Sequence, residues 1–200
     1  MSQQSEKSRP CSCADPSTSV AEFSPEERAL LLCVAHKAIE AALAGSRYKA
    51  EPPTAHLAEL RGAFTTLYLH EQLRGCVGYV FPIASVYQTV AETACAAAFD
   101  DNRFPPVTAP EAAELELLLS ILSPLRPIRA EEVEVGSHGL MVTLGPYRGL
   151  LLPQVPVEHG WDRVTFLEQT CRKAGLPLDA LQKGAVLEAF TAEIFGEGDR

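Results

Sequence analysis

The sequence predicts an α+β fold, with a mainly antiparallel sheet and flanking helices, from three observations. Two pairs of short β-prone runs are each joined by a tight turn, which is typical of hairpins and therefore of antiparallel strands. Three longer segments carry apolar residues at helical spacing. These segments stand between the hairpins, and the sequence lacks the regular alternation of single strands with helices that builds a parallel sheet.

The first predicted helix runs from Pro25 to about Ala44. Ser24 is placed to cap it, Pro25 suits the first helical position, and Glu27 completes a capping box. Gly45 then supplies the left-handed residue at which helices commonly end. The apolar face expected to pack on the core consists of Leu32, Ala35, Ile39, Ala42 and Leu43.

The first hairpin is predicted at residues 63–69 and 73–80, on either side of His70-Glu71-Gln72. Asp100, Asp101 and Arg103 follow a second helix and are expected to cap it and to pair locally. Thr108 and Glu111 match a further capping box, which leads through a short helix into a buried strand at residues 115–122. The apolar positions that mark the second helix are Ile83, Val86, Tyr87, Val90, Ala94 and Ala97.

The second hairpin is predicted at residues 140–144 and 150–152, around a turn that contains Gly145 and Pro146. Asp162 can cap a third helix, which Gly175 ends. Residues 185–195 are predicted as one final β element. The apolar face of the third helix consists of Val164, Leu167, Cys171 and Ala174, so Cys171 is expected in the core.

Composition limits the classes of partner. The 200 residues, 46% of them hydrophobic, suit one domain, which we place at residues 23–197 after a disordered tail at residues 1–22. The formal net charge of −9 makes nucleic acid an unlikely partner, because phosphate backbones are repelled. The start of the chain is polar and no apolar run is long enough to cross a bilayer, so we expect a cytoplasmic protein without a membrane segment.

The six cysteines are interpreted as thiols, because a chain of this size without a secretory signal gives no reason for a disulfide scaffold. None of them shows the Cys-x-x-Cys spacing of a zinc ribbon, and the tail pair Cys11 and Cys13 has no histidine nearby, so no metal site is predicted. The remaining candidates without a recognisable constellation are interpreted as structural, and they are Cys33, Cys95, His36 and His56.

Seven short motifs occur in a fixed order along the chain. They are LRGCVG at residues 73–78, FDDNRFPP at 99–106, LSPL at 122–125, GSHGL at 136–140, GLLLPQ at 149–154, GW at 160–161, and a block from Phe166-Leu167 to CRKAGL at 171–176. Together they resemble the AMMECR-domain family over about residues 25–195.

The resemblance implies an α+β fold of two closely packed subdomains and a function that is poorly defined across the family. Family members are often described as protein A of the AmmeMemoRadiSam system, so a Memo-like protein and a radical SAM protein are the partners that the resemblance implies. No cofactor is indicated. Two positions depart from the family pattern, since Tyr79 replaces a small hydroxyl residue and His159 replaces an aromatic residue before Gly-Trp.

The LRGCVG strand holds the strongest candidates for a site. Strand alternation places Arg74 and Cys76 on one face, where a guanidinium beside a thiol favours the reactive thiolate. Gly75 and Gly78 would leave the backbone open to a ligand. The alternative is a buried structural cysteine beside an arginine that pairs with a carboxylate, with the glycines serving close packing.

Three further polar residues are candidates. His138 lies in a turn ahead of a strand, where it can act as base, acid or ligand, or simply bind backbone. Glu158 is a candidate for binding substrate. Its neighbour His159 need not act with it as a catalytic dyad, because adjacent side chains on an extended segment point in opposite directions. The alternative interpretation of His159 is that of a histidine in a surface loop without a role in a site.

Two hypotheses follow. In the first, the protein is an enzyme or enzyme subunit that acts on a small polar molecule in a cleft, with Cys76 as nucleophile, His138 moving protons and Arg74 orienting an anionic group. In the second, it is a noncatalytic module that presents the strand from Arg74 to Gly78 to a partner protein. A deep pocket joining Cys76 and His138 would favour the enzyme, and a flat exposed patch the module.

Overall fold

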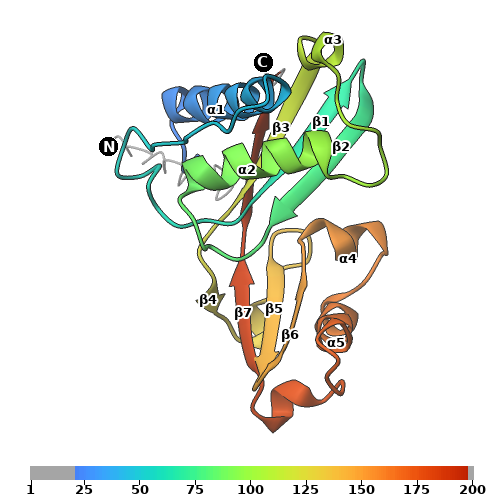
Figure 1. The fold of residues 1–200 in the computed structure, drawn as a ribbon. Coiled ribbons are helices and arrows are strands. Elements are labelled where there is room, and N and C mark those ends of the chain that lie inside the picture. Colours follow the sequence, from blue (N-terminus) through green and yellow to red (C-terminus); the bar gives the residue numbers. More distant parts are fainter. Residues whose placement is uncertain (1–20, 198–200) are drawn as a thin grey trace, which may run out of the picture.

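The computed structural model describes residues 21–197, which form five α-helices and two antiparallel sheets of four strands each (Figure 1). The predicted α+β class is therefore confirmed. Cys11 and Cys13, and most of the predicted tail, lie outside the described residues. No helix in the described part of the chain is long and apolar enough to span a bilayer.

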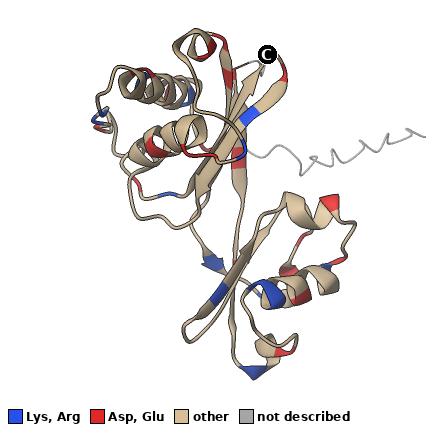
Figure 2. Cartoon of the chain, turned by 45° about the vertical axis from the view of Figure 1, so that its right-hand side comes forward, with Lys and Arg blue, Asp and Glu red and all other residues tan. Residues whose placement is uncertain are grey.

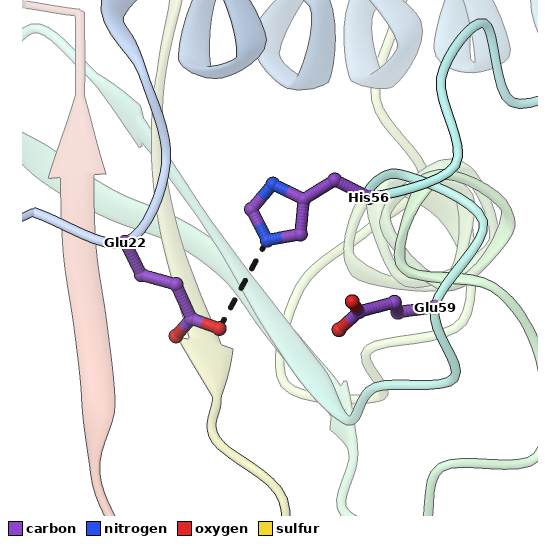
Figure 3. Close-up of side chains that lie close together, drawn as sticks. All are labelled: Glu22, His56 and Glu59. Carbon is purple, nitrogen blue, oxygen red and sulfur yellow. Dashed lines mark ion pairs between the residues drawn. The ribbon is translucent and has the colours of Figure 1, made fainter.

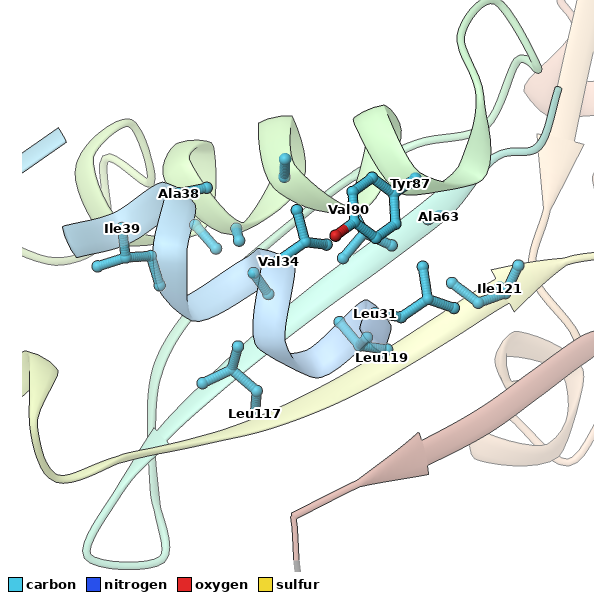
Figure 4. Packing of buried hydrophobic residues seen from close by; sticks show 14 of the residues in the cluster. Leu31, Val34, Ala38, Ile39, Ala63, Tyr87, Val90, Leu117, Leu119 and Ile121 are labelled. Carbon is cyan, nitrogen blue, oxygen red and sulfur yellow. The ribbon is translucent and has the colours of Figure 1, made fainter. Parts of the chain in front are cut away.

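The first sheet has the strand order β2-β1-β3-β8, so β2 and β8 are its edges. Helices α1 and α2 cover one of its faces, and their apolar side chains meet those of the strands in a single cluster (Figures 1 and 4). Alternate residues of β1, such as Ala63 and Leu67, enter this cluster because successive side chains of a strand point to opposite faces. The elements are α1 (Pro25–Leu43), β1 (Ala63–Leu69), β2 (Gln72–Tyr79), α2 (Val86–Phe99), α3 (Ala109–Ala112), β3 (Leu115–Leu122) and β8 (Ala192–Gly196).

The second sheet has the strand order β4-β7-β5-β6 and a hydrophobic cluster of its own, with Phe166 and Cys171 of α5 fully buried in it. The predicted core position of Cys171 is confirmed. The elements are β4 (Arg126–Pro127), the 3-10 turn η1 (Ala130–Glu132), β5 (Gly139–Leu144), β6 (Tyr147–Leu151), α4 (Gln154–Glu158), α5 (Arg163–Lys173), the 3-10 turn η2 (Ala180–Lys183) and β7 (Val186–Phe190).

One strand prediction is wrong. Residues 185–195 form two strands, and β7 pairs with β4 and β5 in the second sheet whereas β8 pairs with β3 in the first. Only Thr191 separates them. Its N–H donates to Ser123 Oγ at 2.9 Å and its carbonyl accepts from Ser123 N–H at 2.9 Å, so the chain changes sheets at a fixed point.

The helix caps were predicted more accurately than the buried faces. Ser24 Oγ accepts from Glu27 N–H at 3.2 Å, Glu27 accepts from Ser24 N–H at 3.1 Å, and Asp162 accepts from Thr165 N–H at 2.8 Å. The predicted face of α1 is shifted, because the fully buried residues are Leu31, Val34, Ala35, Ala38 and Ile39.

Two predicted face residues are exposed. Ile83, expected in the second helix, is 81% exposed and precedes α2, which Ser85 caps. Val164 is 60% exposed, because α5 turns Phe166, Thr170 and Cys171 inward instead.

Candidate functional site

A β-bulge at Arg74 separates the two main candidates of the LRGCVG strand. The register pairs Tyr68 with Leu73 and Leu67 with Gly75, so Arg74 is an extra residue in β2. A bulge breaks the alternation of side chains. The prediction that Arg74 and Cys76 share a face is therefore wrong: Arg74 reaches α3 in the helical layer, and Cys76 stands opposite Thr66 on the sheet face turned away from the helices.

Arg74 ties the edge strand to α3. Its buried guanidinium donates through Nε to Glu111 Oε1 at 3.0 Å and through one terminal nitrogen to Glu111 Oε2 at 3.3 Å and to the Pro106 carbonyl at 3.4 Å. These donors, helped by Thr108, lower the pKa of Glu111 to about 2. Among the described residues the other terminal nitrogen, Nη1, has no hydrogen-bond partner. This contact matches the structural interpretation of Arg74.

Asp101 and Arg103 hold the backbone of Cys76. Asp101 Oδ2 accepts from Cys76 N–H at 2.9 Å, and Arg103 donates to the Cys76 carbonyl at 3.4 Å. Arg103 also donates to Asp101 at 2.9 and 2.7 Å, which confirms the predicted local pair. The Arg103 guanidinium, with the Cys76 N–H, holds the pKa of Asp101 far below its usual range. Cys76 lies in the edge strand β2, where backbone groups that point away from the sheet have no neighbouring strand to bind. At Cys76, Asp101 and Arg103 bind these groups instead.

The glycines of this strand are needed for close packing. A Cβ at Gly75 would lie 2.1 Å from the Ala97 carbonyl oxygen of α2, and a Cβ at Gly78 would lie 2.0 Å from the ring of Phe64. Neither glycine therefore leaves open space for a ligand at its Cα. The Cys76 thiol is half-buried, and Thr66 Oγ1 donates to its sulfur at 3.3 Å.

We call the part of the molecule built around the first sheet the first half, and the part built around the second sheet the second half. His138 lies in the second half, directly before β5. It is buried, and its Nδ1 accepts from Glu134 N–H at 3.1 Å, which closes the turn that leads into β5. Its Nε2 lies 3.5 Å from a terminal nitrogen of Arg126. No contact joins His138 to Cys76 in the described residues, and the imidazole has the backbone-binding role that was its structural alternative.

Glu158 and His159 do not lie on an extended segment as expected. Glu158 is the last residue of the short helix α4 and is exposed, and His159 caps that helix. The His159 ring stacks on Trp161, with centroids 4.7 Å apart and planes inclined by 17°. An imidazole thus replaces the expected aromatic residue in a stacking role.

A cavity lies at the end of β2, between α1 and α2. It measures about 800 Å³, a size that suits a small ligand. Its walls come from α1, α2, the segment at residues 46–50, and Tyr79 at the end of β2. The lining residues are Ala38, Ala42, Ser46, Arg47, Tyr48, Lys49, Ala50, Tyr79, Gln88, Ala91, Glu92, Cys95, Ala96 and Asp100.

This cavity, which we call the α1–α2 groove, has charges of both signs. Arg47 and Lys49 stand on the segment after α1, and Glu92 and Asp100 belong to α2 and its C-cap. Arg47 pairs with Glu92 at 3.5 Å, although the Arg47 side chain is 87% exposed. Of the lining residues, Ala42, Tyr79, Cys95 and Asp100 figured in the sequence predictions, and in other roles. No periodic pattern marks a groove assembled from three separate segments.

A second cluster brings together Glu22, His56 and Glu59, whose ligand-type atoms all lie within 4.8 Å of one another (Figure 3). Their spacing in the sequence gave no such signal. The guanidinium of Arg61, almost fully buried, binds both carboxylates, with its contact to Glu59 at 2.8 Å. His56 Nδ1 lies 2.9 Å from Glu27 Oε1. Arg61 thus supplies the positive charge that a metal ion would supply, and the cluster ties residues 22 and 56–61 together.

Comparison with known proteins places the chain in a family. The model of the AMMECR1 family matches residues 32–195, and the chain belongs to that family. The protein MK0488 of Methanopyrus kandleri is 41% identical over 184 residues, covering 86% of this chain and 89% of its own. A protein of Thermococcus gammatolerans is 44% identical over 182 residues, covering 84% and 88%.

One similar structure is the crystal structure of the uncharacterized protein PH0010 from Pyrococcus horikoshii. It shares 40% sequence identity and a TM-score of 0.67, and the match covers 84% of this chain and 90% of that chain. The relatives support the family and the fold, and their names assign no activity.

Proposed function

We propose that the protein binds a small polar molecule in the α1–α2 groove and acts as a binding protein or binding subunit. The observation that carries this proposal is the groove itself, about 800 Å³ in volume, with aromatic, alanine and charged side chains on its walls. Ligand sites typically combine such apolar walls with a few polar groups that fix the orientation of the ligand.

The arrangement of charge favours a ligand that carries both a cationic and an anionic group, such as an amino acid or a short peptide. Glu92 and Asp100 would face the cationic group, and Arg47 and Lys49 the anionic group. The exposed Arg47–Glu92 pair costs little to open, because surface ion pairs contribute about 0–1 kcal/mol.

Binding is favoured over cysteine catalysis for two reasons. Cys95, the cysteine in the groove, donates its thiol to the Ala38 carbonyl at 3.3 Å, and burial, with Asp100 nearby, raises the pKa of Cys95. The joint Cys76–His138 mechanism has no support, since each residue is held in a different half of the molecule by its own hydrogen bonds.

The groove adjoins the LRGCVG strand. Tyr79 ends that strand and forms part of the wall, and it is one of the two positions at which the chain departs from the expected family pattern. Asp100 is adjacent to Asp101, which fixes Cys76. The LRGCVG strand, held at Cys76 by Asp101 and Arg103, therefore positions one end of the groove. Tyr79 is the residue that we expect to determine which ligand binds.

Calorimetric titration with single amino acids and dipeptides of each charge class tests the proposal. We expect zwitterionic compounds to bind, and Glu92→Gln and Asp100→Asn to weaken binding by about tenfold each. Ala42→Trp should fill the groove and abolish binding while the protein stays folded by circular dichroism. Glu40→Gln, an exposed position of α1 outside the groove, is the matched control. Equal binding by the wild type and Ala42→Trp would exclude the groove as the site.

A second candidate function is the noncatalytic module that binds a Memo-like or radical SAM protein. The observation that favours it is the face of the first sheet opposite the helices, where Leu73 is 42% and Ile194 is 54% exposed. Co-purification of each partner with the wild type and with a Leu73→Ser, Ile194→Ser double variant distinguishes this function. Loss of the partner together with retained amino-acid binding would separate the two candidates.

A further inference from the structure

A smaller cavity of about 260 Å³ lies where the two halves of the molecule meet. One wall is the segment that leaves β2, and the other is built from β5, β6 and the end of α5. The lining residues are Val80, Phe81, Met141, Arg148, Gly149, Leu150 and Lys173. We call this cavity the junction cavity. It shares no lining residue with the α1–α2 groove.

Gly149 lies in the wall of the junction cavity, where the end of α5 packs directly on β6. A Cβ at Gly149 would lie 2.2 Å from the Ala174 nitrogen, so only glycine lets the end of α5 rest directly on β6. Lys173, in the last turn of α5, and Arg148 of β6 both line the cavity. This close packing brings the end of α5, and with it Lys173, to the cavity that Arg148 also lines.

The charge at this cavity is unbalanced. Arg148 and Lys173 line it without any aspartate or glutamate, and neither takes part in an ion pair among the described residues. Over the whole chain acidic residues outnumber basic ones, at a net charge of −9, and both kinds occur in both halves (Figure 2). Two unpaired cations at an apolar cavity attract an anion.

The rest of the lining is apolar. Val80, Phe81, Met141 and Leu150 form the remaining side-chain walls, and Met141 is buried. The Arg148 guanidinium carbon lies 5.5 Å from the centroid of the Phe81 ring, so an aromatic face already orients this cation. A ligand would meet two cationic side chains and an apolar wall in one cavity.

From this arrangement we propose that the junction cavity binds a small organic anion, in which a carboxylate or a phosphate is attached to an apolar or aromatic body. Arg148 and Lys173 bind the anionic group, and Phe81, Met141 and Leu150 contact the body. The site joins the two halves of the molecule, because its walls come from the exit of β2 and from the second sheet. This site is independent of ligand binding in the α1–α2 groove.

Amide-resolved NMR titration of the full chain tests this site with three probes. Benzoate and phenyl phosphate carry the two anionic groups, and benzyl alcohol has a similar body without charge. We expect the anions to shift the amide signals of residues 80–81 and 148–150, with the stronger of the two identifying the preferred group. Arg148→Ala and Lys173→Ala should each weaken binding about fivefold. Arg172→Ala, on the same helix turn but outside the lining, should leave binding within about twofold.

Three results would overturn the proposal. One is that neither anion shifts these amide signals, and another is that benzyl alcohol binds as tightly as benzoate. The third is that Arg172→Ala weakens binding as much as Arg148→Ala, which would reduce the effect to the general field of the helix. All three variants change exposed residues, so folding is retained and the comparison stays valid.

Discussion

Asp101 accepts the backbone N–H of Cys76 at 2.9 Å, although the two residues lie 25 positions apart. The same carboxylate binds Arg103, which in turn reaches the Cys76 carbonyl. An ion pair from the loop after α2 thus takes the place of a neighbouring strand at this point of the sheet edge. The motifs LRGCVG and FDDNRFPP are physically one unit.

The substitution Asp101→Asn should destabilise the fold by about 1–3 kcal/mol, because Arg103 loses its charged partner and the Cys76 N–H keeps only a neutral acceptor. Urea unfolding followed by circular dichroism measures the change. Asp100→Asn, at the adjacent exposed residue, should change stability by less than about 0.5 kcal/mol. Equal effects of the two substitutions would show that the contacts of Asp101 with Arg103 and with the Cys76 backbone do not stabilise the edge strand β2.

The free energy of unfolding should decrease as the pH is lowered, because the pKa values of Asp101 and Glu111 are lowered in the folded protein. A carboxyl group whose pKa is lower in the folded protein stabilises the fold fully at pH values above its unfolded pKa, which is 4.5 for Glu111. This stabilisation is lost as the pH falls towards about 2. Urea midpoints measured between pH 6 and pH 2.5 test this. The combined Asp101→Asn, Glu111→Gln variant should have a flatter profile in this window, and an unchanged slope would contradict the assignment.

Gly75→Ala should cost about 2–4 kcal/mol, since the new Cβ would meet the Ala97 carbonyl at 2.1 Å and α2 would have to move. The control is Cys76→Ala at the next residue, which removes a half-buried sulfur and should cost about 1 kcal/mol. Thermal and urea unfolding of both variants give the comparison. A Gly75→Ala protein as stable as Cys76→Ala would mean that the helix and strand can separate at little cost.

The sequence predicted a reactive thiolate at Cys76 because Arg74 was expected beside it, and the pairing of Arg74 with Glu111 removes that ground. From accessibility we now expect Cys33, which is exposed, to be alkylated first and the half-buried Cys76 next. Burial raises the pKa values of Cys95 and Cys171, so both should react more slowly than Cys33, and the fully buried Cys171 only on unfolding. Peptide mass mapping of a variant with serine at positions 11 and 13 gives the order. Faster labelling of Cys76 than of Cys33 would restore the earlier prediction.

What the sequence predicted well is local. Ser24 with Glu27, and Asp162 with Thr165, form caps within three residues, so the residue types at that spacing suffice. Both hairpins exist because turn residues interrupt the β-prone runs, although β6 begins at Tyr147 and not at residue 150 as predicted.

The site depends on distant contacts and on single-residue irregularities. A bulge adds one residue at Arg74, and a pattern of period two cannot locate it. Asp101 meets Cys76 only after α2 has crossed the sheet, and the α1–α2 groove collects residues from three segments. The change of sheets at Thr191 is equally hidden, because no glycine or proline separates β7 from β8 in the sequence.

The paired hydrogen bonds between Ser123 and Thr191 give the molecule a nested layout. The first sheet takes its strands from residues 63–122 and 192–196, and everything between forms the second sheet with its helices. The second half is therefore an insert whose two ends are held side by side. Such an insert can be exchanged or removed through a short linker without breaking the host sheet, whereas a truncation before residue 192 would strip β8 from the half that contains the groove.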